Sequence, residues 1–108
     1  MKLITAIIKP VKFDYVYAAL EKIGIAGFTA TEVQGITQLE PHRGAEGMAS
    51  FRLKIKIEVA VSDEQLGPVI EVITNAANTG RSGDGRVYVT PLEQSIRIRT
   101  GAACEDAG

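Results

Sequence analysis

The sequence predicts one α+β domain, in which a four-stranded antiparallel sheet carries two helices on one face. Three observations predict this fold. The length of 108 residues suits a single domain, the first half follows a strand–helix–strand pattern, and the same pattern returns fifty residues later. Two successive βαβ units of this kind form a ferredoxin-like double βαβ sandwich, which we expect to span residues 1–108.

The first half begins with an aliphatic, β-branched run at residues 3–9, which is typical of a strand and which Pro10 ends. A helix is expected from Asp14 onward, because the apolar residues that follow recur at helical spacing. Gly24 is expected to close this helix. Residues 29–36 then alternate loosely between apolar and polar side chains and predict the second strand.

The second half repeats this pattern. A strand is expected around residues 53–57, followed by a helix with Ser62 as N-cap, because Gln65 three positions later completes a capping-box spacing. Gly80 is expected to end this helix, and residues 86–90 to form the fourth strand. The offset of fifty relates Val16, Ala19, Leu20 and Ile23 to Leu66, Val69, Ile70 and Ile73. A chance match of two short units is the alternative, and the shared register argues against it.

Two helices can cover only one face of such a sheet. No third long helix is available in the sequence, so we expect another subunit to cover the second face, in a closed ring rather than an open stack. Residues 36–50, between the halves, show little periodicity and predict a long functional or mobile loop. Residues 101–108 predict a flexible tail.

Composition narrows the classes of function. A formal net charge of −1 gives no broad basic field, so no nucleic-acid partner is expected. The single cysteine, Cys104, forms no internal disulfide, and the apolar start of the chain is too short for a secretory signal, so a cytoplasmic location is expected. No histidine–cysteine cluster has metal spacing and no serine or cysteine has a histidine partner, so neither a metal site nor an enzyme is expected.

The segment NTGRSGDGRVYV, residues 78–89, is rich in glycine. Its glycines are Gly80, Gly83 and Gly85. Glycine adopts positive φ readily and lets backbone N–H groups converge on a ligand, and a nest of this kind holds phosphate oxygens. Arg81 and Arg86 flank the loop, and the planar guanidinium suits phosphate. The alternative is a glycine-rich turn with a solvated arginine at each end.

A second basic cluster lies in SIRIRTG, residues 95–101. If this segment is extended, Arg97 and Arg99 point to one side and the isoleucines between them to the other. Two arginines on one face repel unless an anion lies between them, which favours a phosphate site. The alternative is an edge strand with guarding charges. The glycine loop and these arginines could meet within one chain or across a subunit boundary.

Lys54 and Gln38 are candidates for a small-anion site, because they lie at the two roots of the long loop. The alternative for Lys54 is a solvated strand face.

Several stretches of the chain resemble the PII signal-transduction family. They are the opening ITAIIKPVKFDYVYAALEKIGIAGFTATEVQG, the central RGAE, the segment KIKIEVAV, the loop TGRSGDGRVYV and the ending IRIRTG. The resemblance extends from Met1 to Gly101. It implies a homotrimer with adenine-nucleotide sites between subunits and no catalysis. Members sense ATP and ADP, many also sense 2-oxoglutarate with Mg-ATP, and they act on transporters or enzymes through a long T-loop.

The resemblance also implies roles for segments of this chain. It places the T-loop at residues 36–50, a phosphate-binding B-loop at residues 79–86 and a C-terminal segment at residues 97–108. Within the B-loop, Gly83, Asp84 and Gly85 are implied to hold phosphates. Beside them, Arg86 stands where the family usually has lysine, which keeps the charge and alters the geometry.

The remaining site residues come from other parts of the chain. Arg97 and Arg99 match phosphate-binding arginines that reach in from a neighbouring subunit. Thr29 falls at an adenine-contacting position. Lys54 falls at the lysine that pairs with a 2-oxoglutarate carboxylate, and Gln38 matches the ligand-binding glutamine only with a one-residue slip.

The T-loop departs from the family pattern. It is shorter, and TQLE, residues 37–40, replaces a glycine–arginine–glutamine–lysine run. Glu40 places a negative charge where a cation is expected, which disfavours a dicarboxylate. The sequence therefore predicts a divergent trimeric regulator that binds ATP, ADP or AMP without a further cofactor. We expect it to sense bicarbonate, as carboxysome-associated PII-like proteins do, and to control a membrane transporter or an enzyme.

Three alternatives stay open. The first is a nitrogen-regulatory PII protein that senses ATP, ADP and 2-oxoglutarate and controls ammonium uptake or assimilation. The second is a slow nucleotide hydrolase, for which Asp84 is the one carboxylate near the phosphate loop in sequence. The third is a purely structural trimer.

Overall fold

The computed structural model describes residues 1–38 and 49–104, with the side chains of all but residues 37, 38 and 49. The elements are β1 (Lys2–Ile8), the 3₁₀ turn η1 (Pro10–Lys12), α1 (Phe13–Lys22), β2 (Thr29–Gln38), β3 (Ala49–Val61), α2 (Asp63–Ala77) and β4 (Gly85–Pro91). The order of strands and helices is the predicted double βαβ.

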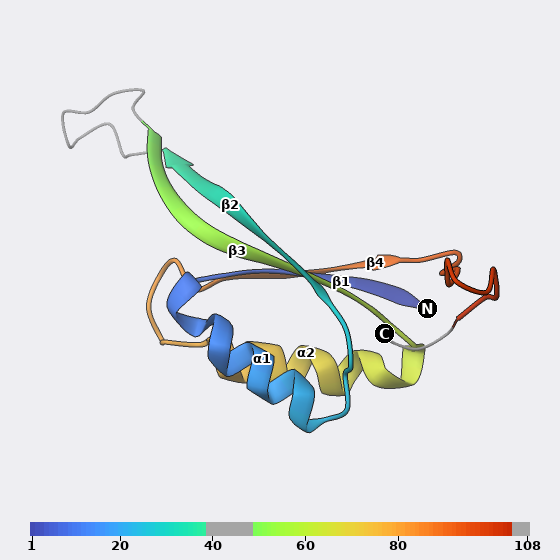
Figure 1. Ribbon diagram of the computed structural model, residues 1–108. Coiled ribbons are helices and arrows are strands. Elements are labelled where there is room, and N and C mark those ends of the chain that lie inside the picture. The colour runs from blue at the N-terminus through green and yellow to red at the C-terminus, as the bar shows by residue number, and fades with distance from the viewer. Residues whose placement is uncertain (39–48, 105–108) are drawn as a thin grey trace.

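The four strands form one antiparallel sheet in the order β2-β3-β1-β4. Both helices lie on one face of it, and β2 and β3 extend beyond the sheet as a two-stranded arm (Figure 1). The ferredoxin-like sandwich predicted from the internal repeat is therefore confirmed. No helix of the described residues lies on the opposite face of the sheet, which leaves this face open to a partner.

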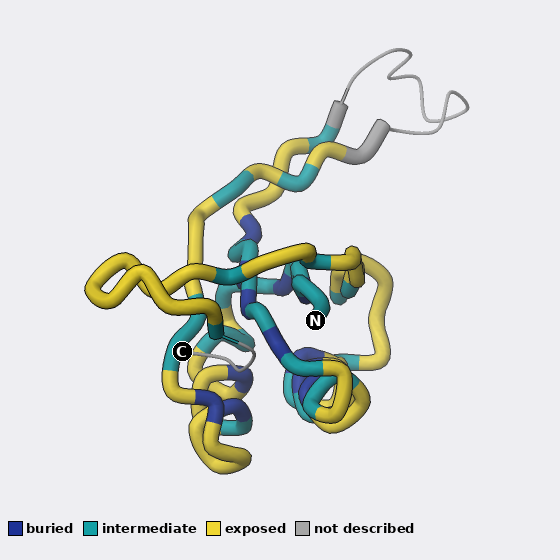
Figure 2. Tube along the Cα trace, turned by 90° about the vertical axis from the view of Figure 1, so that its right-hand side faces the viewer, coloured by how far each residue is buried: buried dark blue, intermediate teal, exposed yellow. Residues whose placement is uncertain are grey.

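The core lies between the sheet and the helices, as the buried segments in Figure 2 show. Alternate residues of β1 and β3 point toward the helices, and the apolar stripe of each helix points back. The largest fully buried side chains are Ile4, Ile8, Val16, Leu20, Ile57, Val59, Val61, Val69 and Ile73. Four of the eight helix positions related by the offset of fifty are in this set.

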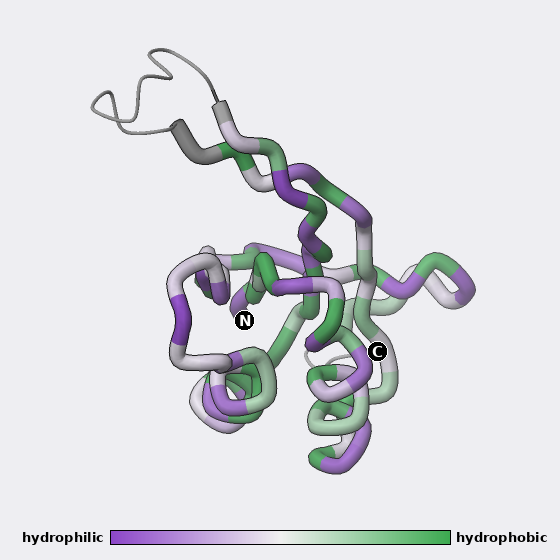
Figure 3. The backbone as a smooth tube through the Cα atoms, turned by 90° about the vertical axis from the view of Figure 1, so that its left-hand side faces the viewer, coloured by the Kyte–Doolittle hydropathy of each residue, from purple (hydrophilic) through white to green (hydrophobic). Residues whose placement is uncertain are grey.

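The arm differs from the core because its apolar side chains are exposed. Hydrophobic and hydrophilic residues alternate along it (Figure 3), and neither α1 nor α2 lies beneath the part of β2 and β3 that extends beyond the sheet. Ile36, Phe51 and Leu53 are each more than half exposed, at 63%, 63% and 54%. Ile36 and Phe51 pair directly across the two strands, so their side chains share one face.

Two differences from the expected element boundaries bear on the candidate site. α2 ends at Ala77 rather than at Gly80, because Asn78 turns to extended backbone and Gly80 donates its N–H to the Asn78 side chain. β2 reaches Gln38 and β3 begins at Ala49, so antiparallel pairing takes up both ends of the expected loop at residues 36–50. The rest of the expected T-loop lies outside the described residues.

The prediction of an extended segment at residues 95–101 is wrong, and so is its edge-strand alternative. The chain forms a tight loop closed by a single bridge between Ile96 and Ala103. The Arg97 N–H donates to the Ala102 carbonyl at 2.9 Å, and the Gly101 N–H donates to the Arg97 carbonyl at 2.7 Å. These local bonds, with Gly101 at φ +69°, override the strand-like alternation. The expected flexible tail is likewise part of this loop up to Cys104.

The capping box at the start of α2 gives a stability prediction. The Gln65 N–H donates to the Ser62 hydroxyl at 3.2 Å, and the Ser62 N–H donates to the Gln65 side chain at 3.0 Å, as the spacing predicted. Ser62→Ala should lower the free energy of unfolding by about 1 kcal/mol, measured by urea titration. Thr74→Ala is the control, because the Thr74 hydroxyl bonds only carbonyls of its own exposed helix turn. Equal losses for both variants would contradict a role for the cap.

Among the described residues, no helix has the length and apolar character that crossing a membrane requires.

Candidate functional site

The glycine-rich loop between α2 and β4 is held by the Asp84 carboxylate. This carboxylate accepts the Thr79 N–H at 2.8 Å, the Gly80 N–H at 3.1 Å and the Thr79 hydroxyl. Gly80, Gly83 and Gly85 all have positive φ, at +76°, +86° and +111°. The loop therefore has the backbone conformation that the glycines predicted, but Asp84 shapes it from within.

Lys9, which directly follows β1, completes this arrangement. Its ammonium lies 3.1 Å from the Asp84 carboxylate and 3.4 Å from the Thr79 hydroxyl. The Thr79 hydrogen bonds, joined by Lys9, hold the pKa of Asp84 well below its usual value of 3.8. Asp84 is therefore an ionised structural group, and its engagement by the loop disfavours the general-base role that a hydrolase would need.

The depressed pKa of Asp84 predicts an acid-dependent loss of stability. A carboxyl group with a lowered folded-state pKa stabilises the fold above its unfolded pKa, and this contribution falls as pH drops below about 3.8. Urea unfolding at pH 6 and at pH 3 should show a larger acid loss for the wild type than for Asp84→Asn. The pKa of Asp63 is also lowered, by the chain amine and then Lys2, and acts in the same direction in both proteins. An identical pH dependence in both would contradict this assignment.

Lys54 approaches the same loop from β3. Among the described residues it is the one buried charged side chain, at 9% exposure, and its ammonium donates to the Gly83 carbonyl. Its stem crosses Gly35 of β2, where an added Cβ would lie 3.1 Å from the Lys54 Cγ. The interpretation of Lys54 as part of a solvated strand face is therefore wrong, because the stem packs on a glycine and the head is held by the loop.

A cleft with a volume of about 450 Å³ opens beside these groups. The described residues that line it are Lys9, Gly35, Ser50, Arg52, Lys54, Ser82 and Gly83. They include three cations and two hydroxyls, and no carboxylate is among them, so the cleft favours an anion. Gln38, the other small-anion candidate, pairs with Ala49 in the arm, and its side chain lies outside the described set. Alternation along β3 places Arg52 on the face of Lys54, but from the sequence alone this face resembles an ordinary solvated one, so no site role is predicted for Arg52.

A second cleft of about 420 Å³ lies at the opposite end of the domain. Its lining includes Gly27, Thr29, Glu58 and residues 95–98, so the predicted adenine-contact residue Thr29 and Arg97 border one hollow. Thr29 and Glu58 are direct partners across β2 and β3. The sequence does not predict a site role for Glu58, because a charged residue at an alternate position of a strand resembles an ordinary exposed residue.

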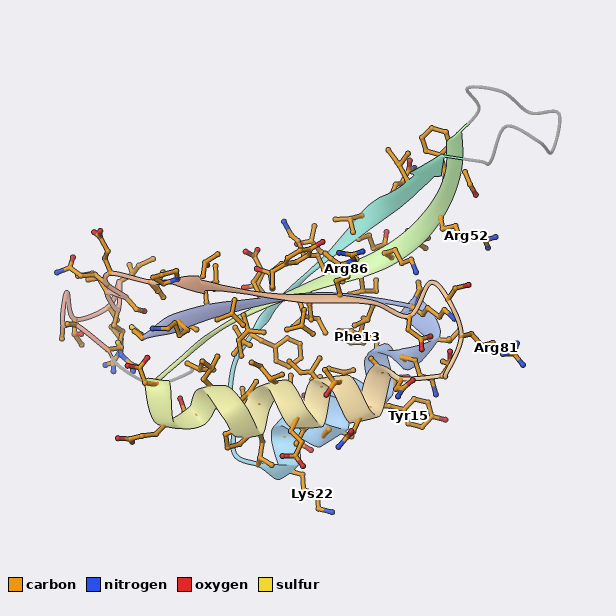
Figure 4. The ribbon with its side chains drawn as sticks, turned by 180° about the vertical axis from the view of Figure 1, so that it is seen from behind. Phe13, Tyr15, Lys22, Arg52, Arg81 and Arg86 are labelled. Atoms are coloured by element: carbon orange, nitrogen blue, oxygen red, sulfur yellow. The ribbon has the colours of Figure 1, made fainter. Side chains whose placement is uncertain are left out.

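The two groups of predicted phosphate contacts lie far apart in one chain. The glycine-rich loop precedes β4 and the arginine loop follows it, so the seven residues of this strand, roughly 20 Å, separate them. Figure 1 shows the two loops at opposite ends of the sheet. Figure 4 shows Arg86 on the sheet face away from the helices and Arg81 projecting from the loop. A site that uses both groups therefore cannot form within one chain and has to span two.

Comparison with known proteins agrees with the fold and with the motifs. A family model described as "Nitrogen regulatory protein P-II" matches residues 1–102. The chain is 50% identical to "Nitrogen regulatory protein GlnK" of Escherichia coli (strain K12) over 111 residues, which cover 99% of each chain. It is 49% identical, with the same coverage, to "Nitrogen regulatory protein P-II" of Rhizobium meliloti (strain 1021) and of Azospirillum brasilense. The chain belongs to the nitrogen regulatory protein P-II family.

Proposed function

We propose that this protein is a nitrogen-regulatory signal-transduction protein that binds adenine nucleotides between the subunits of a homotrimer and controls a transporter or an enzyme. The relatives above are named as nitrogen regulatory proteins and match this chain from end to end. They favour the nitrogen alternative over the bicarbonate branch expected from Glu40, a residue outside the described set.

The single observation that carries the proposal is the separation of two complementary half-sites in one chain. One end of the sheet offers Gly83, Gly85 and Arg86 beside a cationic cleft. The other end offers Thr29 and Arg97 around a second hollow, with Arg99 in the same loop. A nucleotide bound between two subunits would seat its phosphates at the first end of one subunit, within reach of Arg97 and Arg99 of the other, and its adenine beside Thr29 of that other subunit.

The uncovered face of the sheet supports the oligomer. Leu3, Thr5 and Ile7 of β1 and Tyr88 of β4 lie on this face by the strand register, opposite the buried residues that face the helices. Tyr88 is 51% exposed. Contact with further copies would cover this face, and a closed ring repeats the same contact without leaving an open end.

The chemistry of the first cleft supports a dicarboxylate effector. Lys54 and Arg52 point into it from alternate positions of β3. Two cations are better neutralised by a dianion than by bicarbonate, which carries a single charge. We therefore place 2-oxoglutarate ahead of bicarbonate as the small-anion effector.

Regulation would then follow from linkage. Nucleotide and small anion favour particular conformations of the arm, and a partner protein binds only some of them. The exposed apolar side chains of the arm, Ile36, Phe51 and Leu53, are suited to such a partner. Cytoplasmic location is part of this proposal, since the effectors are cytoplasmic metabolites.

Calorimetry tests the proposal directly. ATP and ADP should each release or absorb measurable heat on binding, 2-oxoglutarate should raise the affinity for Mg-ATP, and bicarbonate should leave the affinity for ADP unchanged. A bicarbonate effect without a 2-oxoglutarate effect would restore the carbon-sensing alternative. The absence of any nucleotide binding would favour the structural trimer, and steady phosphate release from ATP would favour the hydrolase.

A further inference from the structure

We propose that Lys54 is a latch between the β2–β3 arm and the glycine-rich loop, and that its release allows the loop to turn an N–H group toward a phosphate. The inference rests on the proposed nucleotide site and concerns how that site is regulated.

The latch is a contact between elements far apart in sequence. Lys54 lies in β3, where the arm joins the sheet, and its ammonium donates to the carbonyl of Gly83 in the loop. The lysine is buried, and Gly35 leaves room for its stem, with the Cγ and Cε at 3.1 and 3.5 Å from an added Cβ. The arm and the loop are therefore joined through one side chain.

The latched loop presents the wrong group to an anion. The Gly83 carbonyl points to the Lys54 ammonium, at the wall of a cleft otherwise lined with cations and hydroxyls. In a trans peptide the following N–H, which belongs to Asp84, points the opposite way. The partly negative oxygen thus occupies the place where a phosphate-binding loop presents an N–H.

The loop is built so that this one peptide can rotate. Gly83 and Gly85 lie on either side of Asp84, at φ +86° and +111°, and glycine adopts many other backbone conformations at little cost. The Asp84 side chain stays anchored to Thr79 and Gly80. Rotation of the Gly83–Asp84 peptide would replace the oxygen by an N–H without displacing the whole loop.

This geometry predicts whether a small anion at Lys54 favours or opposes phosphate binding at the glycine-rich loop. An anion that draws the Lys54 ammonium away from Gly83 removes the contact that stabilises the carbonyl-inward loop. The population then shifts toward the N–H-inward loop, which holds phosphate. The cooperation between 2-oxoglutarate and Mg-ATP that the proposed function expects would then pass through Lys54, which also connects it to the arm.

Solution NMR of Lys54→Met without nucleotide tests the latch. Methionine keeps an apolar stem and removes the ammonium, so the carbonyl ¹³C resonance of Gly83 should move in the direction of a lost hydrogen bond. Amide exchange at Thr79 and Gly80 should stay at the wild-type rate, because the Asp84 carboxylate still accepts both N–H groups. Lys56→Met is the matched control. The ammonium of this neighbouring lysine of β3 lies 3.9 Å from the Glu58 carboxylate and not at the glycine-rich loop, so this variant should give the wild-type Gly83 resonance.

Two further results decide the matter. If Lys54→Met does not fold, Gly35→Ala replaces it: the added methyl group presses on the Lys54 stem and should produce the same changes with the ammonium still present. Saturating the wild type with ADP should move the Gly83 resonance in the same direction as Lys54→Met. A wild-type Gly83 carbonyl resonance in both variants, or an ADP complex with Gly83 still bonded to Lys54, would overturn the proposal. Failure of nucleotide binding would remove the proposed function and leave the latch experiment valid, because that experiment contains no nucleotide.

Discussion

Gly85→Ala is expected to destabilise the fold by roughly 3–5 kcal/mol, more than any other single substitution in the glycine-rich loop. A Cβ at Gly85 would lie 1.7 Å from the carbonyl oxygen of Ile7 and 2.8 Å from its carbon. These are main-chain atoms of β1, so no side chain can rotate away. The φ of +111° adds strain for any residue with a side chain. Urea unfolding should show the loss, and a broadened or absent NMR spectrum would show failure to fold.

Gly24→Ala separates the cost of a positive φ from the cost of the clash with β1. Gly24 has a φ of +86°, and nothing lies within 4 Å of an added Cβ. This variant should lose only about 1–2 kcal/mol, the cost of a left-handed conformation at one residue. A loss at Gly85 no larger than the loss at Gly24 would show that β4 relaxes away from β1, and that the close approach is not a fixed feature of the site.

Removing both arginines of the C-terminal loop is expected to weaken ADP binding by at least about 100-fold, because each charge-assisted contact contributes on the order of 1.5–3 kcal/mol. Arg97 and Arg99 are exposed, and their loop is held by backbone hydrogen bonds, so Arg97→Ala with Arg99→Ala should fold normally. Adenosine carries no phosphate, and its weak binding should be nearly unchanged. Calorimetric titration of both ligands measures the two effects.

The control for this prediction is Lys22→Ala, which removes a positive charge at the far end of α1, away from the sheet (Figure 4). It should leave the affinities for ADP and adenosine at their wild-type values. Equal losses of ADP and adenosine affinity in the double arginine variant would mean that the adenine pocket or the trimer had been damaged. An unchanged ADP affinity would mean that the arginines take no part in holding phosphate.

Most of the fold was predictable because the spacing of apolar residues along the sequence indicates which side chains are buried. The helical positions at Val16, Leu20, Val69 and Ile73 are buried as their spacing implies. The capping box at Ser62 was predictable too, because both partners lie within one turn of each other in sequence. Local chemistry of this kind needs no knowledge of the tertiary structure.

The site was only partly predictable, because its key contacts join distant segments. The sequence indicated a phosphate loop at Gly83, but it did not show that Gly85 touches β1 or that Lys54 is buried against Gly35. The alternation of isoleucine and arginine around Arg97 is typical of a strand. The hydrogen bonds across residues 95–104 show that the segment is a loop. The sequence left open whether loop and arginines meet in one chain, and the length of β4 decides that they do not.

The central claim is that each nucleotide site is shared between two subunits. Its most direct test is complementation in trimers that contain two different variants. One variant lacks the arginines (Arg97→Ala with Arg99→Ala), and the other carries Arg86→Glu, which repels phosphate at the glycine-rich loop. Each alone should bind ADP poorly. If the site is shared between subunits, refolding the two together should restore high-affinity ADP binding, because an intact loop of one variant then meets intact arginines of the other. Mixed rings that bind ADP no better than either parent would contradict a site assembled from two chains.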